Sequence, residues 1–227
     1  MTPEVEPGTL AVFSDIACPW AHIAVHRLHD HRKALGLVDR VALDHRAFPL
    51  EVVNRAGTSK PFLEVEIEAL RDVQPTAGWQ LWRGEPWTWP VTMLPALEAV
   101  QAAKAQGHQA AEALDLALRE AFFGASRCIS LRHVILQVAK SVPQVDVDRL
   151  RKDLDEGVAR SSVMRDYESA GDVVRGSPHI FFADGTDAFN PGIESHWDGK
   201  PGKGTLIVDR DDEAVYDELL LRAAGSG

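Results

Sequence analysis

The amino-acid sequence predicts an α/β domain that is interrupted by a large, all-helical insertion. Three observations lead to this prediction: a strand–helix–strand pattern near the start, helical periodicity through the middle, and short strands followed by a helix near the end. We therefore expect residues 9–57 and 171–223 to form one domain and residues 58–170 to form the helical subdomain inserted into it.

The first part has the pattern of a βαβ unit. The segment TLAVFSD, residues 9–15, is short, apolar and rich in strand formers, which predicts a buried strand. A helix is expected from Pro19, because proline is tolerated at the first helical position, to about Leu35, with Gly36 as its stop. In DRVALDHRAF, apolar residues recur at every second position, which predicts a second strand.

The middle part is predicted to be helical throughout. The segments ALDLALREAFF, SLRHVILQVA and VDVDRLRKDLDEGV each carry apolar residues at helical spacing. Ser130 is a plausible N-cap for the second of these helices. Stripes of this kind indicate packing into a core.

The last part supplies the remaining strands and a final helix. HIFFA predicts a strand, Asp184–Gly185 predicts a hairpin turn, and Phe189 is expected to open the next strand. GTLIVD predicts a further extended segment, and DEAVYDELLLRAA predicts the closing helix. Without the insertion the order is β-α-β-β-β-α or a close variant, which matches a thioredoxin-like layout with one sheet built from both ends of the chain.

Composition narrows the classes of function. The 227 residues carry a net charge of −10, so nucleic acid is a poor partner, and no apolar run is long enough to span a membrane. Two cysteines do not make a disulfide scaffold, and the segment MTPEVEPGTL lacks the plan of a signal peptide. We therefore expect a cytoplasmic protein with reduced thiols.

Cys18 stands at the expected mouth of the first helix, in the stretch AVFSDIACPWAHIAVHRL. The N–H groups at a helix start are unpaired and carry about half a positive elementary charge. Position alone therefore predicts a stabilised thiolate, with a Cys18 pKa well below the usual ~8.5. Cys18 is the candidate nucleophile, and an inert buried cysteine is the alternative.

A second candidate segment is VRGSPHIF, in which a Ser–Pro bond leads directly into a predicted strand. In the expected layout this loop faces Cys18, and we expect the Ser177–Pro178 bond to be cis. The backbone of Ser177 could then bind an incoming peptide or thiol compound as an added strand would. An ordinary trans proline at a strand start is the alternative.

These segments resemble the DsbA family, especially its cytoplasmic FrnE-type branch. FSDIACPWAHIAVHRL resembles the family's strand followed by D-x-x-C-P-W-C at a helix start, and GSPHIFF resembles its cis-proline loop. FPLE and ALREAFFGASRCISLRHVILQVA resemble the exit of the second strand and the insertion helices, so the likeness runs over about residues 9–223. The resemblance implies a thioredoxin-like fold and thiol–disulfide chemistry, with Cys18, Pro19, Trp20 and Ala21 as the active-site motif.

Ala21 departs from the family pattern, because it stands where the family usually has its second cysteine. One sulfur cannot close an internal disulfide at this site, so we expect a monothiol cycle in which Cys18 forms a mixed disulfide and an external thiol releases it. The expected substrate is a thiol or disulfide, protein or small molecule, with glutathione as a possible co-substrate and no tightly bound cofactor. Whether the chain forms a homodimer stays open.

Two other functions remain open at this stage. Kappa-class glutathione transferases and 2-hydroxychromene-2-carboxylate isomerases share the layout and need one glutathione-activating group, with which C-P-W-A is compatible. The third possibility is a binding module whose redox function has been lost.

Several further residues are candidates for supporting roles. Asp15 and His22 are candidates for tuning the thiol, and His179 for exchanging a proton with it or binding substrate beside Ser177 and Pro178. His22, His26 and His29 follow one helical face, but we expect no metal there.

Cys128 and a cluster of tryptophans complete the candidates. Cys128 is a weak candidate for resolving a disulfide at Cys18, since nothing in the sequence brings the two cysteines together. The segment WQLWRGEPWTWP holds four of the six tryptophans, and we expect a mixture of core packing and contact with an apolar ligand.

Overall fold

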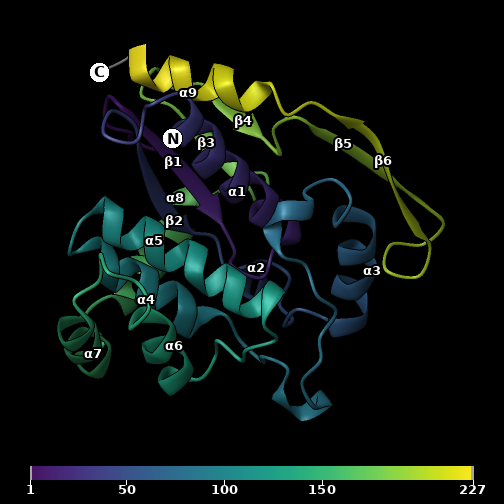
Figure 1. Ribbon diagram of the computed structural model, residues 1–227, viewed down its shortest axis with the longest axis horizontal. Coiled ribbons are helices and arrows are strands. Elements are labelled where there is room, and N and C mark those ends of the chain that lie inside the picture. The colour runs from purple at the N-terminus through teal and green to yellow at the C-terminus, as the bar shows by residue number, and fades with distance from the viewer. Residues whose placement is uncertain (1, 226–227) are drawn as a thin grey trace.

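The centre of the molecule is a four-stranded sheet built from both ends of the chain. The computed structural model describes residues 2–225, and the sheet order is β2-β1-β3-β4. Strand β1 (Thr9–Ser14) pairs in parallel with β2 (Ala42–Ala47), and antiparallel with β3 (His179–Phe181), which in turn pairs with β4 (Asp187–Phe189). Figure 1 shows the first and last parts of the chain side by side in this sheet.

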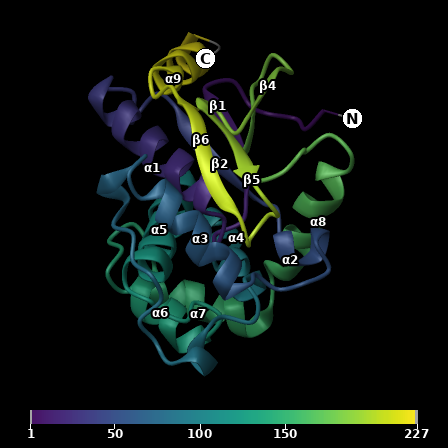
Figure 2. The same ribbon diagram turned by 90° about the vertical axis from the view of Figure 1, so that its right-hand side faces the viewer.

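Alternation along the strands gives the sheet two apolar faces. Leu10 and Val12 of β1, with Ile180 of β3, pack in one cluster with α1 (Pro19–Ala34) and α9 (Val215–Gly225). Phe13 and Phe181 turn to the opposite face and meet at 5.6 Å between ring centroids. Strands β1 and β3 are therefore buried on both faces, whereas the edge strand β4 is largely exposed. Figure 2 shows α9 and α8 at opposite sides of the sheet.

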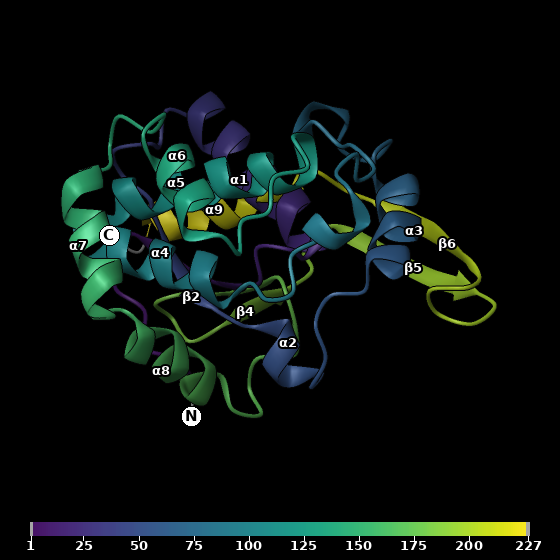
Figure 3. The ribbon, with the colours of Figure 1, turned by 90° about the horizontal axis from the view of Figure 1, so that it is seen from below.

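The segment between β2 and β3 is helical, and it supplies most of a second apolar core. Its α-helices are α2 (Leu50–Val53), α3 (Lys60–Leu70), α4 (Leu94–Lys104), α5 (His108–Arg119), α6 (Arg132–Ala139), α7 (Val147–Glu156) and α8 (Arg160–Ala170). Two short 3-10 turns (Pro75–Ala77 and Pro86–Thr88) and a π-helical turn (Glu120–Gly124) join them. Figure 3, the view from below, shows α4, α5, α6 and α7 grouped together and α3 apart from them, beside β5 and β6.

One cap in the insertion was predicted wrongly. Helix α6 begins at Arg132 with Leu131 in the N-cap position, and the hydroxyl of Ser130 donates instead to Thr92 O at 2.7 Å. The hydroxyl thus ties α6 to the loop before α4, which only the tertiary structure reveals.

The last strands also differ from the prediction. Phe189 ends β4 rather than opening it, and β5 (Ile193–Asp198) and β6 (Thr205–Asp211) form a separate two-stranded sheet. The sequence of β5, IESHWD, escaped prediction because most of its side chains are exposed and leave no apolar pattern. This hairpin packs against α3 and projects beyond the sheet (Figure 1). No helix among the described residues has the length and apolar character to cross a membrane.

Candidate active site at the start of helix α1

Cys18 occupies the N-cap position of α1, directly after the turn that follows β1. Pro19 takes the first helical position, and the backbone of Cys18 is extended, with φ −80° and ψ 118°. The side chain of Cys18 is only 4% exposed. Two features therefore affect the pKa of the Cys18 thiol: its burial and its position at the start of the helix.

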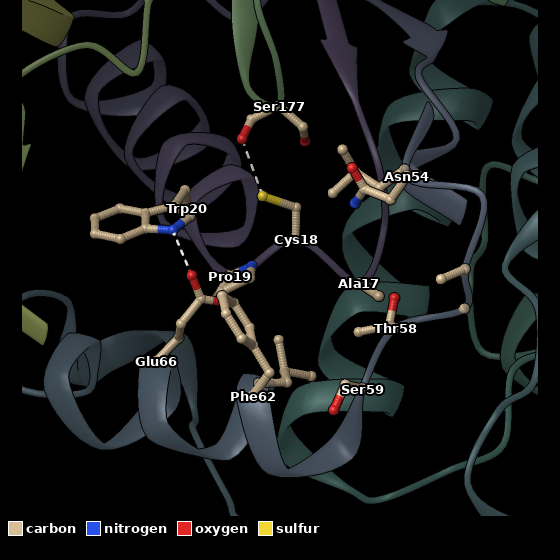
Figure 4. Close-up of a pocket in the computed structure, with 14 residues that line it drawn as sticks. Ala17, Cys18, Pro19, Trp20, Asn54, Thr58, Ser59, Phe62, Glu66 and Ser177 are labelled. Atoms are coloured by element: carbon tan, nitrogen blue, oxygen red, sulfur yellow. Dashed lines mark hydrogen bonds between the residues drawn. The ribbon is translucent and has the colours of Figure 1, made fainter. Parts of the chain in front are cut away.

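The loop before β3 faces this sulfur, as the sequence predicts. The Ser177–Pro178 peptide bond is cis, and the thiol of Cys18 donates to Ser177 O at 3.0 Å. The hydroxyl oxygen of Ser177 also accepts a hydrogen bond from the backbone N–H of Asp15 at 2.9 Å. Figure 4 shows Ser177 directly across from the sulfur. Residues 159 positions apart thus meet at one point.

Asp15 fixes the turn between β1 and Cys18. Its carboxylate accepts the backbone N–H of Ala17 and that of Leu50, both at 2.8 Å. Burial raises the pKa of Asp15 to about 6, and these two N–H groups oppose that rise. The side chain therefore joins the start of α1 to α2 and adds negative charge near the sulfur at neutral pH.

The expected lowering of the Cys18 pKa is wrong. Burial raises the pKa of the thiol to about 12, although the side-chain hydroxyl of Ser177 and the Ala21 N–H oppose this rise. Nearby Glu66 and Asp15 raise it further by charge repulsion. Burial therefore keeps Cys18 protonated at neutral pH, as a thiol that donates a hydrogen bond to Ser177 O.

A pocket of about 340 Å³ opens beside Cys18. One wall is formed by Ala17 to Trp20 and Ser177. The other is formed by Leu50, Asn54, residues 56–59, Phe62, Leu63 and Glu66. The first wall comes from the thioredoxin-like part, and the second comes from α2, α3 and the loop between them. The sulfur is thus reached from a cleft between the two parts of the chain (Figure 4).

Glu66 of α3 is a pocket residue that was not among the candidates from the sequence. Its Oε1 accepts the indole N–H of Trp20 at 3.0 Å, and burial raises the pKa of its carboxyl to about 7. A signal for it existed in the sequence: Leu63, Ile67 and Leu70 mark the buried face of this helix, and Glu66 lies on the same face. A carboxylate on an apolar helix face indicates a specific role or partner.

His22 is a residue of α1, and its side chain contacts the insertion. Its Nε2 is 3.0 Å from Ala77 O, and its ring contacts Trp79 and Phe123. Burial lowers the pKa of His22 well below its usual range, so the neutral ring donates to Ala77 O. Its tuning of Cys18 stays a prediction. Among residues 2–225, no group of three or more His, Cys, Asp or Glu side chains is arranged to hold a metal ion.

Both ring nitrogens of His179 have partners other than the sulfur. The backbone N–H of Arg175 donates to Nδ1 at 3.1 Å, and Nε2 lies 2.8 Å from a carboxylate oxygen of Asp187. Burial lowers the pKa of His179, although Asp187 opposes this. No ring nitrogen is therefore left to exchange a proton with Cys18.

The tryptophan cluster lies apart from the pocket. Trp79, Trp82 and Trp89 pack against the helical core, whereas Trp87 is 80% exposed. The tryptophan that lines the pocket is Trp20 of the active-site motif. Cys128 is a free, partly exposed cysteine in the turn before α6, and it does not line the pocket either.

Arg119 at the end of α5 ties the insertion to the active-site turn. It is fully buried, is paired with Asp115 at 2.6 Å, and donates to Asp15 O at 3.0 Å and to the Ser14 hydroxyl at 2.8 Å. A buried guanidinium with this many partners fixes the turn before Cys18. Nothing in the sequence singled it out, because its partners in the turn, Asp15 and Ser14, are more than 100 residues away.

Known structures share this fold. The chain is similar to a probable DsbA oxidoreductase from Streptomyces coelicolor, with a TM-score of 0.66 and 18% identity, covering 96% of this chain and 91% of the other. The cytosolic disulfide reductase DsbM from Pseudomonas aeruginosa, solved with GSH, gives a TM-score of 0.61 at 14% identity and 96% coverage of both chains. A 2-hydroxychromene-2-carboxylate isomerase gives 0.57 at 18% identity, covering 80% and 88%.

Sequence comparison extends this likeness to a family. No curated protein sequence matches the chain. Residues 9–197, which include β1, Cys18, the insertion and the Ser177–Pro178 loop, match the DSBA-like thioredoxin domain. With this match and the strand order, helical insertion and site geometry described above, the chain belongs to the DSBA-like thioredoxin family.

Proposed function

We propose that this protein exchanges thiols and disulfides through Cys18 as its single nucleophile. The observation that carries the proposal is the position of one sulfur at the start of α1, across from Ser177 and open to a pocket. Alanine at position 21 leaves that sulfur without a partner in the motif. The backbone of Ser177 beside Pro178 is proposed to position the substrate.

The proposed cycle has two balanced exchanges. Cys18 loses its proton, and its sulfur attacks one sulfur of a disulfide, so that a new S–S bond forms and the old one breaks. The leaving thiolate takes up a proton. An external thiolate then attacks the substrate sulfur of the mixed disulfide, so that Cys18 leaves, takes back a proton and is regenerated, and the substrate sulfur forms a disulfide with the external thiol. A second external thiol is needed to reduce that product, and the two external thiols then end as their own disulfide.

Glutathione is a candidate for the external thiol. DsbM, which shares the fold, was solved with GSH, and a reducing cytoplasm would supply such a thiol. We place the protein in the cytoplasm as part of the same proposal.

Mass spectrometry after incubation with oxidised glutathione tests the proposal. We expect an adduct on Cys18 in the wild type and in Cys128→Ser, and none at this site in Cys18→Ser. An adduct confined to Cys128 would reject the assignment of the nucleophile.

A glutathione-dependent transferase or isomerase is the second candidate. Ala21 favours it because such chemistry needs one activating group, and an isomerase is among the proteins of similar fold. Conjugation of glutathione to an electrophile, without exchange at Cys18, would favour this candidate. Absence of both activities would favour a redox-inactive binding module.

A further inference from the structure

The charge of the pocket is unusual for a site that handles an anionic thiolate. Among the described residues, Cys18 and Glu66 are the titratable side chains that line it, and no lysine or arginine does. Glu66 is 9% exposed, so its carboxylate is largely removed from water. The pocket therefore combines a buried thiol with a buried acid and contains no basic side chain.

Glu66 lacks a cationic partner in the described part of the chain. Its partner is the Trp20 indole, which donates to Oε1, whereas neighbouring Glu64 forms an ion pair with Lys60 at 2.9 Å. Figure 4 shows the Glu66 side chain rising from α3 toward Trp20 and the start of α1. A buried carboxylate with one neutral donor is poorly compensated, and a bound cation would compensate it.

A cation at this place would also assist the sulfur. Glu66 and Asp15 both disfavour the Cys18 thiolate by charge repulsion. A positive group bound at Glu66 offsets that repulsion and favours the thiolate. The substrate would thereby help to activate the nucleophile that attacks it.

We propose that Glu66 selects disulfides that carry a protonated amine close to the sulfur, and disfavours anionic ones. This inference rests on the proposed exchange at Cys18 and adds the chemical class of its substrate. The ammonium group donates to the carboxylate of Glu66, and one sulfur of the substrate lies beside Cys18. The carbon chain between the ammonium group and the sulfur lies against Phe62 and Leu63, two apolar residues that line the same pocket.

Cystamine, a small disulfide with two ammonium groups, is the probe for this step. The Cys18 sulfur forms an S–S bond to one cysteamine unit, the disulfide of cystamine breaks, and the other unit leaves as a thiolate. That thiolate takes up a proton from water, which replaces the proton lost by Cys18. No further oxidant or reductant is needed.

The test compares three disulfides in the Cys128→Ser background: cystamine, the neutral bis(2-hydroxyethyl) disulfide, and anionic oxidised glutathione. Rates of mixed-disulfide formation are read by mass spectrometry. We expect cystamine to react about tenfold faster than the neutral disulfide, and oxidised glutathione to react slowest, as expected for an ion pair in a partly buried site. Glu66→Gln should lower the ratio of the cystamine rate to the neutral-disulfide rate to the ratio that the two disulfides show with a free thiol, because cysteamine is intrinsically the better leaving group.

Glu68→Gln is the matched control, because Glu68 lies on the same helix and is exposed. It changes the net charge equally and should keep the ranking. Glu66→Asp retains the charge and should keep part of the preference, which separates loss of charge from loss of folding. An equal ratio of the cystamine rate to the neutral-disulfide rate in the wild type and Glu66→Gln would overturn the inference. A fall of that ratio in Glu68→Gln as large as in Glu66→Gln would overturn it too.

A binding measurement separates this inference from the proposed function. Calorimetry of cystamine with Cys18→Ser/Cys128→Ser requires no sulfur chemistry, and adding Glu66→Gln should weaken binding about tenfold. Glu66-dependent binding without any exchange by the wild type would reject the proposed function and keep the charge selection. Disulfide exchange by the wild type, with binding and relative rates that do not depend on Glu66, would reject the charge selection and keep the proposed function.

Discussion

The two walls of the pocket differ in what they contribute and in how they are built. The thioredoxin-like wall supplies the sulfur of Cys18 and the backbone of Ser177, at 3.0 Å from one another. The wall from α2, α3 and the loop between them supplies the buried acid Glu66. The first wall thus places the nucleophile, and the second adds, through Glu66, a negative charge that disfavours the thiolate of Cys18.

The contact that ties α5 of the insertion to the turn before Cys18 is expected to have the largest effect on stability. Arg119→Met removes the buried cation that pairs with Asp115 and bonds the turn before Cys18. We expect the free energy of unfolding to fall by about 3–5 kcal/mol, because a buried carboxylate is left uncompensated. Urea unfolding of this variant measures the loss.

Two further variants sharpen that result. Arg151→Met, at an exposed position, should change stability little. Asp115→Asn combined with Arg119→Met should recover part of the loss, because no unpaired charge remains. If Arg151→Met lowered the free energy of unfolding as much as Arg119→Met, the buried contacts of Arg119 could not be the cause of the loss.

Restoring the missing cysteine tests the geometry of the first wall. In Ala21→Cys the new sulfur lies one helical turn from Cys18, whose sulfur the Ala21 N–H approaches. We expect an internal disulfide that stabilises the fold by about 2 kcal/mol, as loop closure over four residues predicts. Mass spectrometry before and after reduction detects it, and a persistently reduced pair in oxidising buffer would contradict the placement of the two side chains.

Much of the first wall could be predicted from the sequence. The strand, the Cys-Pro-Trp helix start and the Ser177–Pro178 loop are local patterns, and local patterns report local backbone conformation. The pKa of Cys18 could not be predicted this way, because it depends on burial by residues 50–66 and on the charge of Glu66. Arg119 could not be predicted for the same reason, because its partners Asp15 and Ser14 reach it only when α5 packs near the end of β1.

The interface between α1 and the insertion should make stability depend on pH. The folded-state pKa of His22 is lowered from 6.5 by burial, so the fold favours its neutral form. Its contribution is therefore fully present above pH 6.5 and is lost as the pH falls below this value. Relative to His22→Gln, the wild type should lose up to about 1.4 kcal/mol per pH unit below that point.

Urea unfolding at several pH values in that window measures this difference. Glu66 and Asp15, whose folded-state pKa values are raised, have the opposite effect, since the fold gains stability as they take up protons. They are present in both proteins and cancel in the comparison. Parallel pH profiles for the wild type and His22→Gln would contradict a neutral buried ring.

The smallest effect concerns the bond between the two walls at Trp20. Trp20→Phe removes the indole donor to Glu66, so the pKa of that carboxyl should rise above about 7. We expect a loss of about 1 kcal/mol in the free energy of unfolding at alkaline pH, where Glu66 is ionised, and a smaller loss below its pKa. Trp87→Phe, at an exposed position, is the control and should show no such pH dependence.

Titration of the Cys18 thiol tests the central claim most directly. The ultraviolet absorbance of the thiolate is followed against pH in Cys128→Ser, with Cys18→Ser/Cys128→Ser as the blank. If burial and nearby carboxylates outweigh the helix terminus, no thiolate forms below about pH 9 in the protein alone. A midpoint near pH 6–7, the range of thiols activated by a helix start, would contradict the account.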